Sequence, residues 1–259
     1  MTRTYIVTGS ASGIGKATCD VLSEQGHRVI GVDIANADVV VDLATPDGRS
    51  MLVREVTDLT DGVVDAVLAV AGLATPTPAT AAVNYFGTIA TLTGLRPLLA
   101  KSPAPRAVAV SSMAALFPPD EQLLVELRAE NEAAALARAA ALAEDPQTGG
   151  LIYGTAKRAL SQWIRRAAPT PEWAGASIAL NAIAPGVVRT PMTAGLTATE
   201  EGSRQLAEMV PMPLNGFFAA RDAAELLAWL TSEANAHLCG QVIYIDGGSD
   251  AVMRSDSVW

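Results

Sequence analysis

Short runs rich in β-branched residues alternate with segments of helical spacing along almost the whole chain of 259 residues. The first run is Thr4–Thr8, and the segment 13–25 that follows places apolar residues on one helical face. Strands that alternate with helices are typical of βαβ units, in which neighbouring strands are parallel. Because crossovers between such strands are right-handed, we predict an α/β fold with a doubly wound parallel sheet flanked by helices.

The alternation continues to the last strand without a break in composition, which predicts one domain over residues 1–259. Half of the residues are apolar, so the chain can bury a sizeable core. Further strands are expected at residues 28–32, 38–43, 63–71, 107–111, 177–183 and 241–245, and further helices at residues 80–101, 151–168 and 221–231.

Two segments depart from the simple alternation. Residues 118–147 are rich in Ala, Leu and Glu and have prolines near both ends, which predicts one inserted helix. Residues 191–218 are rich in Thr, Gly, Met and Pro, and their apolar residues have no expected sheet to join. Such a segment beside a ligand cleft is often a mobile lid, although an ordinary surface connection is the alternative.

The net charge of −9 disfavours nucleic acid and anionic lipid as partners. No apolar run reaches the length of roughly 18 residues that a membrane span requires, and the N-terminus does not have the pattern of a secretory leader. We therefore expect a cytoplasmic protein that does not bind a membrane. Two cysteines and two histidines are too few for a disulfide framework or a zinc site, so no metal is predicted.

A glycine-rich turn joins the first strand to the first helix, in the sequence Thr-Gly-Ser-Ala-Ser-Gly-Ile-Gly at residues 8–15. Glycines there allow a sharp turn and let a pyrophosphate approach the positive end of the helix. In this strand-to-helix context the turn predicts a dinucleotide site in a Rossmann-like fold. The residues assigned to it are Gly9, Ser12, Gly13, Ile14 and Gly15.

Asp33 ends the second expected strand, where a carboxylate accepts hydrogen bonds from both adenosine ribose hydroxyls and repels a 2′-phosphate. The next residue, Ile34, offers no compensating positive charge, so NAD is predicted rather than NADP. Asp42 with Leu43 follows as an acceptor for the adenine amino group, or as a plain exposed strand end. The small pair Ala71 and Gly72 leaves room for the adenosine ribose.

Tyr153 and Lys157 lie at positions i and i+4 of an expected helix, and therefore on one face. A lysine cation and the positive ring of NAD⁺ would both lower the pKa of a neighbouring tyrosine, which could then take an alcohol proton. The spacing alone also fits an ordinary exposed helix face. Ser112 at the end of the preceding strand offers a hydroxyl for the reacting oxygen, and mid-helix Asn84 suggests a bound water that passes protons to Lys157.

Together these motifs resemble the short-chain dehydrogenase/reductase family over essentially the whole chain. The resemblance implies Asn84, Ser112, Tyr153 and Lys157 as the catalytic residues, and Pro185, Gly186, Val188 and Thr190 beside the nicotinamide carboxamide. The Ala-Val-Ala-Gly stretch at residues 69–72 departs from the usual Asn-Asn-Ala-Gly of the family, at an implied cost in local hydrogen bonds rather than in activity.

Tyr153 follows Ser112 by 41 positions, far more than an ordinary strand-to-helix connection needs. Most of the gap is the segment 118–147, which resembles an insertion in bacterial 3α-hydroxysteroid dehydrogenase/carbonyl reductases. That resemblance implies an apolar alcohol or ketone substrate, a steroid included; aryl-allylic alcohols of the coniferyl type, or alicyclic alcohols, are the alternative. It also implies a homodimer through residues 221–231 and 241–245, because the insertion would cover the usual tetramer contact.

Apolar side chains of the lid, with Met113, are expected to form the substrate wall, since methionine fills irregular gaps; packing beneath the lid is the alternative. They are Met113, Met192, Leu196, Met209, Met212 and Phe217. A non-catalytic NAD sensor would not need Ser112, Tyr153 and Lys157 together. A sugar-nucleotide epimerase is disfavoured because no residues remain for a second, C-terminal substrate domain.

Overall fold

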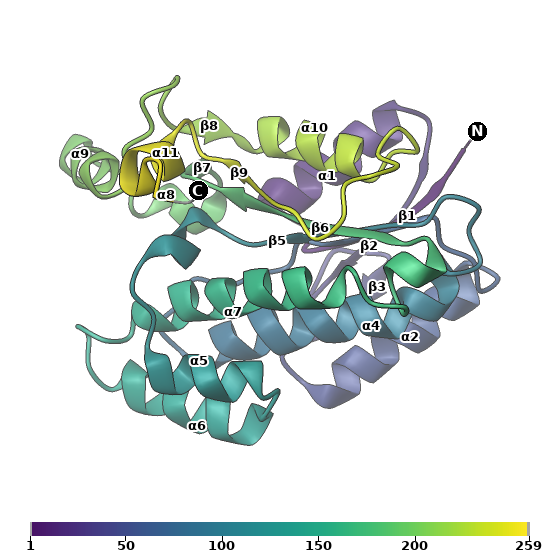
Figure 1. The fold of residues 1–259 in the computed structure, drawn as a ribbon, viewed down its shortest axis with the longest axis horizontal. Coiled ribbons are helices and arrows are strands. Elements are labelled where there is room, and N and C mark those ends of the chain that lie inside the picture. The colour runs from purple at the N-terminus through teal and green to yellow at the C-terminus, as the bar shows by residue number, and fades with distance from the viewer. Residues whose placement is uncertain (1, 258–259) are drawn as a thin grey trace.

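The computed structural model describes residues 2–257 and contains a parallel sheet of seven strands in the order β3-β2-β1-β4-β5-β6-β9 (Figure 1). Successive strands extend the sheet to one side of β1 and then to the other, so the order reverses between β1 and β4. The predicted fold class is confirmed. The strands are β1 Thr4–Thr8, β2 Arg28–Asp33, β3 Val39–Val40, β4 Ala66–Ala69, β5 Arg106–Val110, β6 Ala179–Pro185 and β9 Val242–Ile245.

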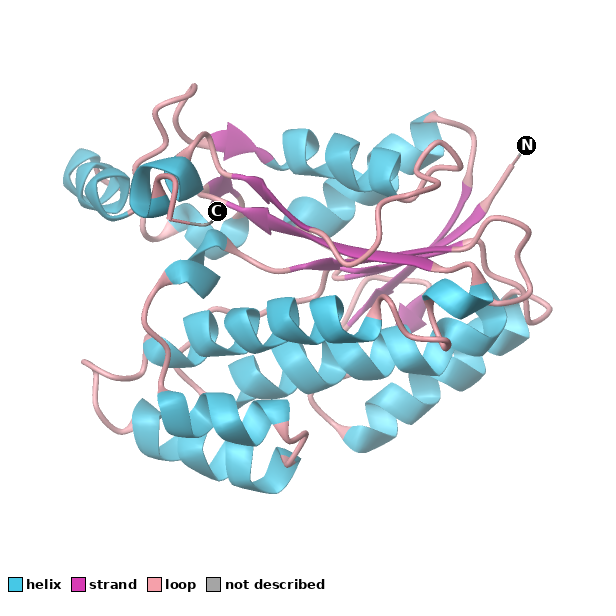
Figure 2. Ribbon diagram, viewed as in Figure 1, coloured by secondary structure: helices cyan, strands magenta, loops and turns pink. Residues whose placement is uncertain are grey.

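Helices cover both faces of the sheet, as Figure 2 shows. Alternate residues of β1 divide between the two faces: Tyr5 and Val7 belong to the apolar cluster under one helix layer, and Ile6 belongs to the cluster under the other. Because both faces are covered, the central strand β4 is apolar and buried throughout. One layer holds α1 Gly13–Glu24 and α10 Ala220–Leu230; the other holds α2 Pro46–Leu59, α4 Thr88–Leu99 and α7 Leu151–Ala167.

The insertion forms a pair of helices, α5 Glu121–Arg128 and α6 Glu132–Ala143, rather than the single helix predicted. The chain breaks at Glu130, whose φ of 54° lies in the left-handed region. Asn131 then starts the second helix by accepting a hydrogen bond from the amide of Ala134. The two helices pack on each other and outside α7, and they form an additional layer at the lower left of Figure 1.

Three other elements differ from the prediction. The strand expected at residues 38–43 is only Val39–Val40. The helix expected at residues 80–101 is three consecutive segments, α3 Pro78–Ala81, the π-helical η1 Ala82–Gly87 and α4. Helix α2 was not predicted, although Thr45 caps it at the amide of Gly48 and Pro46 occupies its first position, both ordinary start signals.

The segment 191–218 contains two short helices, α8 Pro191–Ala194 and α9 Glu200–Met209, and none of the residues of either helix is buried. Its end does have a sheet partner, because β8 Phe218–Ala219 pairs in parallel with β7 Val188–Arg189. The last helix is α11 Ser249–Arg254, and short 3-10 turns are η2 Met113–Leu116 and η3 Ala174–Ala176. Within residues 2–257 no helix has the length and apolar character of a membrane span.

Candidate active site

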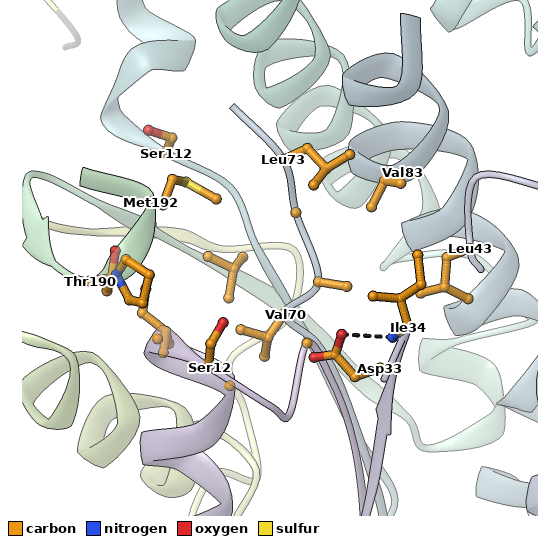
Figure 3. A pocket seen from close by; sticks show the side chains of 18 of the residues that line it. Ser12, Asp33, Ile34, Leu43, Val70, Leu73, Val83, Ser112, Thr190 and Met192 are labelled. Carbon is orange, nitrogen blue, oxygen red and sulfur yellow. Dashed lines mark hydrogen bonds between the residues drawn. The ribbon is translucent and has the colours of Figure 1, made fainter. Parts of the chain in front are cut away.

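A pocket of about 460 Å³ opens where the strand order reverses, at the carboxyl ends of β1, β2 and β4 to β6. In doubly wound sheets this is the usual ligand position. Every residue predicted to bind the cofactor lines the pocket, as do Ser112, Tyr153 and Lys157. Figure 3 shows Asp33, Ile34 and Leu43 on one side of this pocket and Ser112, Thr190 and Met192 on the other.

The glycine-rich turn is shaped by close backbone approaches. Gly9 has a φ of 71°, and a Cβ there would lie 2.9 Å from the Cα of Ala71 at the end of β4. A Cβ on Gly15 would overlap the carbonyl oxygen of Gly9, so α1 can begin directly against the turn only with glycine at this position. The turn therefore presents the N-terminus of a twelve-residue helix to the middle of the pocket, a geometry suited to a pyrophosphate.

Asp33 ends β2 with both carboxylate oxygens engaged by backbone. Oδ2 accepts from the amide of Ala11 at 2.9 Å. Oδ1 accepts from the amide of Ile34 at 2.7 Å, the bond that Figure 3 marks with a dashed line. These two bonds fix the carboxylate at the pocket wall, and each oxygen keeps a further lone pair for a ribose hydroxyl. Asp42 is exposed and accepts from the amide of Ala44, whereas Leu43 is buried at the same wall.

Tyr153 lies on the first turn of α7, beside Ser112 at the end of β5. A hydrogen bond from the Ser112 side chain lowers the pKa of the Tyr153 hydroxyl, but burial has the larger effect and raises it. The hydroxyl is therefore protonated at neutral pH in this structure. Ser112 Oγ also accepts from the amide of Ala114 at 3.1 Å, which starts the turn η2.

Lys157 lies one turn further along α7, with its side chain buried. Its Nζ donates to the carbonyl oxygen of Val110 at 2.7 Å and lies 5.8 Å from the centre of the Tyr153 ring. Burial lowers the pKa of this ammonium to about 8. The adjacent Ser111 does not share the role of Ser112, because its hydroxyl is bonded to the Lys157 carbonyl and to Ser161.

Asn84 lies in η1 outside the pocket lining, and its side chain binds the backbone of one neighbour. Its Oδ1 accepts from the amide of Leu73 and its Nδ2 donates to the Leu73 carbonyl, both at 2.8 Å. The side chain thus links η1 to the pocket wall after β4, and a water at Asn84 that passes protons to Lys157 stays a prediction. A Cβ on Gly72 would lie 3.1 Å from Asn84 Oδ1 and 3.5 Å from Lys157 Nζ, so only glycine fits comfortably between them.

The predicted substrate residues do not gather at one place. Only Met192 lines the pocket. Met113 and Met212 are buried in a small apolar cluster with Val187 and Val210, and Phe217 packs against it. Leu196 and Met209 are 58% and 61% exposed.

Some lining residues were missed by the sequence reasoning. Val32, Ile34 and Val70 are neighbours of strand ends already assigned to the site, and that position could have predicted them. No sequence pattern marks the lining residues that come from helices. The missed lining residues are Val32, Ile34, Val41, Ala44, Val70, Leu73, Ala79, Val83, Val110, Ser111, Pro191 and Thr193.

This arrangement offers a nucleotide-sized pocket that has a fixed carboxylate at one end and, at the other, a tyrosine between a hydroxyl donor and a lysine. The sequence profile of the family described as Enoyl-(Acyl carrier protein) reductase matches residues 9–250. The chain belongs to the short-chain dehydrogenase/reductase family, as its motifs predicted, and is therefore an oxidoreductase.

Within that family the similarity to hydroxysteroid dehydrogenases is confirmed. The chain is 36% identical to the 3-alpha-hydroxysteroid dehydrogenase/carbonyl reductase of Comamonas testosteroni, over 96% of this chain and 97% of that protein. It is 31% identical to a coniferyl-alcohol dehydrogenase of a Pseudomonas species, over 95% and 96%. The crystal structure of the 3-alpha-hydroxysteroid dehydrogenase from Pseudomonas sp. B-0831 complexed with NADH matches with a TM-score of 0.88 and 37% identity, over 98% and 99% of the chains.

Proposed function

We propose that this protein is an NAD(H)-dependent oxidoreductase that interconverts a secondary alcohol and a ketone, with a 3α-hydroxysteroid as substrate. The observation that carries this proposal is the gathering of Ser112, Tyr153 and Lys157 at one end of a pocket that has Asp33 at the other. The similarity to two 3-alpha-hydroxysteroid dehydrogenases, one of them crystallised with NADH, supports both the cofactor and the substrate class.

The residues present fit a dinucleotide without a 2′-phosphate. Asp33 brings a negative charge to the ribose position, and the neighbouring Ile34 is 67% exposed with no cation to offset that charge. Gly9 and Gly15 keep Cβ atoms away from the turn that would meet the pyrophosphate. A nicotinamide ring, when bound at the tyrosine end, supplies the donor or acceptor of the hydride.

The chain's own groups would handle the proton. In reduction, the protonated Tyr153 hydroxyl donates to the carbonyl oxygen, which Ser112 holds by a second hydrogen bond. In oxidation, the same hydroxyl must first lose its proton, and the Lys157 cation within the same helix turn favours that loss. The Leu73 amide donates to Asn84 Oδ1, and the Val110 carbonyl oxygen accepts from Lys157 Nζ. These backbone groups keep both side chains in place.

The apolar side chain of Met192 at the tyrosine end of the pocket suits a substrate with an apolar body. A coniferyl-type or alicyclic alcohol is the second candidate, favoured by the relative that is a coniferyl-alcohol dehydrogenase. A mobile lid at residues 191–218, a homodimer through α10 and β9, and a cytoplasmic location remain predictions.

Absorbance at 340 nm with a panel of alcohols tests the proposal. We expect NADH to form with NAD⁺ and a 3α-hydroxysteroid, and much more slowly with NADP⁺. Faster turnover of coniferyl alcohol or cyclohexanol would select the second candidate. Tight NADH binding without turnover of any alcohol or ketone would instead indicate a non-catalytic NAD-binding regulator.

A further inference from the structure

Arg49 on α2 is a largely buried arginine, with 10% of its side chain exposed, and its guanidinium joins three separate parts of the chain. Its Nε donates to the carbonyl oxygen of Leu43 at 2.8 Å, and Nη2 contacts the carbonyl oxygens of Ala44 at 3.1 Å and Ala82 at 3.3 Å. Nη1 and the same Nη2 form a two-pronged ion pair with Glu132, at 2.9 Å to Oε2 and 2.7 Å to Oε1. Only a planar guanidinium can serve all of these acceptors at once.

Two of these acceptors belong to the pocket wall. Leu43 and Ala44 line the pocket at the end beside Asp33, opposite the tyrosine end where the nicotinamide would lie. The proposed function therefore places the adenine half of the cofactor against this wall. Arg49 itself lies behind the wall, because it binds the two carbonyl groups without lining the pocket.

Besides the bonds from Arg49, close packing restricts the backbone of this wall. A Cβ on Gly48 would overlap the Asp42 carbonyl oxygen, and one on Gly87 would lie 2.9 Å from the Leu43 carbonyl oxygen. The wall is thus pressed between α2 and η1, and Arg49 bonds to both sides of the junction through Leu43 and Ala82.

Glu132 brings the insertion into this arrangement, since it is the first residue of α6. Its carboxylate is less exposed than most surface acids, at 29%, and the Arg49 side chain is only 10% exposed. An ion pair with this degree of burial and with two parallel hydrogen bonds holds geometry far better than an exposed pair. Apart from Glu132, the Arg49 guanidinium contacts only backbone carbonyl groups and the face of Phe86 among residues 2–257, with 5.9 Å from its Cζ to the ring centre.

We propose that Arg49 and Glu132 are positioning residues, through which the inserted helices fix the adenine wall of the cofactor pocket at Leu43 and Ala44. This inference rests on the proposed function, because it names the dinucleotide's adenine half as the ligand. It gives the insertion a role in cofactor affinity in addition to any role in substrate choice or assembly.

Binding of two probes by the full-length protein tests the inference: NADH followed by fluorescence, and ADP-ribose followed by calorimetry. We expect Glu132→Gln and Arg49→Lys each to raise the Kd for both probes by about fivefold. The kcat at saturating NAD⁺ should stay within twofold of wild type, because the tyrosine end is untouched. A purely structural loss would instead lower the active fraction and leave the Kd of the folded protein unchanged.

The matched control is Arg138→Gln, which breaks the other ion pair of the insertion, between Arg138 and Asp120 at 2.6 Å. That pair joins α6 to the start of α5 without bonding the wall, so the Kd for ADP-ribose should not change. An equal rise in all three variants, or no rise with Glu132→Gln and Arg49→Lys, overturns the inference while leaving the proposed function intact. Failure of the wild-type protein to bind either probe overturns the proposed function and the inference together.

Discussion

At the Asp33 end of the pocket, backbone amides hold the Asp33 carboxylate and the largely buried Arg49 holds the wall at Leu43 and Ala44. At the Met192 end the wall belongs to α8, a short helix with no buried residue. The first end has contacts that a single added Cβ would disrupt, at Gly48 and Gly87. The second rests on a small cluster around Met212. The difference suggests a rigid cofactor end, common to many substrates, and a substrate end whose side chains can adapt.

Tyr153 lies at the end of the pocket opposite Asp33, and Tyr153→Phe is the change with the largest expected effect. Loss of the hydroxyl removes the proton donor and acceptor, so kcat should fall by about a thousandfold while the Kd for NADH stays within twofold. Steady-state rates and NADH fluorescence measure the two quantities. Tyr85→Phe is the control, since the Tyr85 hydroxyl is buried without a hydrogen-bond partner among the described residues. Near-normal turnover by Tyr153→Phe would refute the assignment.

Two methionines of the lid differ in burial, because one packs beneath the lid and the other lies on its surface. Met212 is buried, and its sulfur accepts from the amide of Val187, whereas Met209 is 61% exposed. Met212→Ala should reduce the free energy of unfolding by about 2–4 kcal/mol, and Met209→Ala by less than about 0.5 kcal/mol. Urea unfolding curves give both values. Equal losses would mean that the cluster beneath the lid is not packed as the structure has it.

Lys157 makes the cofactor-free protein sensitive to pH. Burial lowers the pKa of its ammonium to about 8, whereas an exposed lysine has a pKa of about 10.4. Between these values the unfolded chain binds more protons than the folded one, so the free energy of unfolding should rise with pH, by about 2–3 kcal/mol from pH 8 to pH 10. Urea unfolding over this range should show the rise in wild type and a smaller slope in Lys157→Met. The same slope in both proteins would show that Lys157 is not buried as an isolated cation.

The contrast between the two ends also explains what the sequence could predict. At the cofactor end, Gly9, Gly15 and Asp33 carry out tasks that depend on residue type and on position at a strand end. These requirements fix which residue type stands at which distance from a strand end, so the sequence alone predicts the cofactor residues. At the lid, Met192 and Met209 are chemically identical, yet one lines the pocket and the other faces solvent. Only the packing of α8 and α9 distinguishes them, and no sequence spacing encodes it.

The insertion shows the same limit in the fold. Its helical content was evident from composition, and Asn131 followed by Glu132 is a start signal that would have divided it into two helices. The ion pair between Arg49 and Glu132 joins residues 83 positions apart, so no pattern of neighbouring residues in the sequence predicts it. Likewise, the Asn84 side chain in the π-helical η1 is held by the backbone of Leu73, eleven positions earlier, and no local pattern predicts that contact.

The smallest expected effect concerns the choice between NAD and NADP at the rigid end. Asp33→Asn keeps the shape of the side chain but removes the charge that would repel a 2′-phosphate. We expect the preference for NAD⁺ over NADP⁺, measured as the ratio of kcat/KM values, to narrow by about tenfold, or about 1.4 kcal/mol. Asp38→Asn is the matched control, because Asp38 accepts from the Gly31 amide at the same sheet edge but does not line the pocket.

An unchanged ratio in Asp33→Asn would mean that the exclusion of a 2′-phosphate is steric and comes from the wall itself. The backbone bonds from Ala11 and Ile34 to Asp33 would then be its main contribution. In that case a variant that loosens the wall, such as Glu132→Gln, should narrow the ratio more than Asp33→Asn does. If the preference for NAD⁺ over NADP⁺ narrows in Asp33→Asn but not in Asp38→Asn or Glu132→Gln, the charge of Asp33 determines the choice of cofactor.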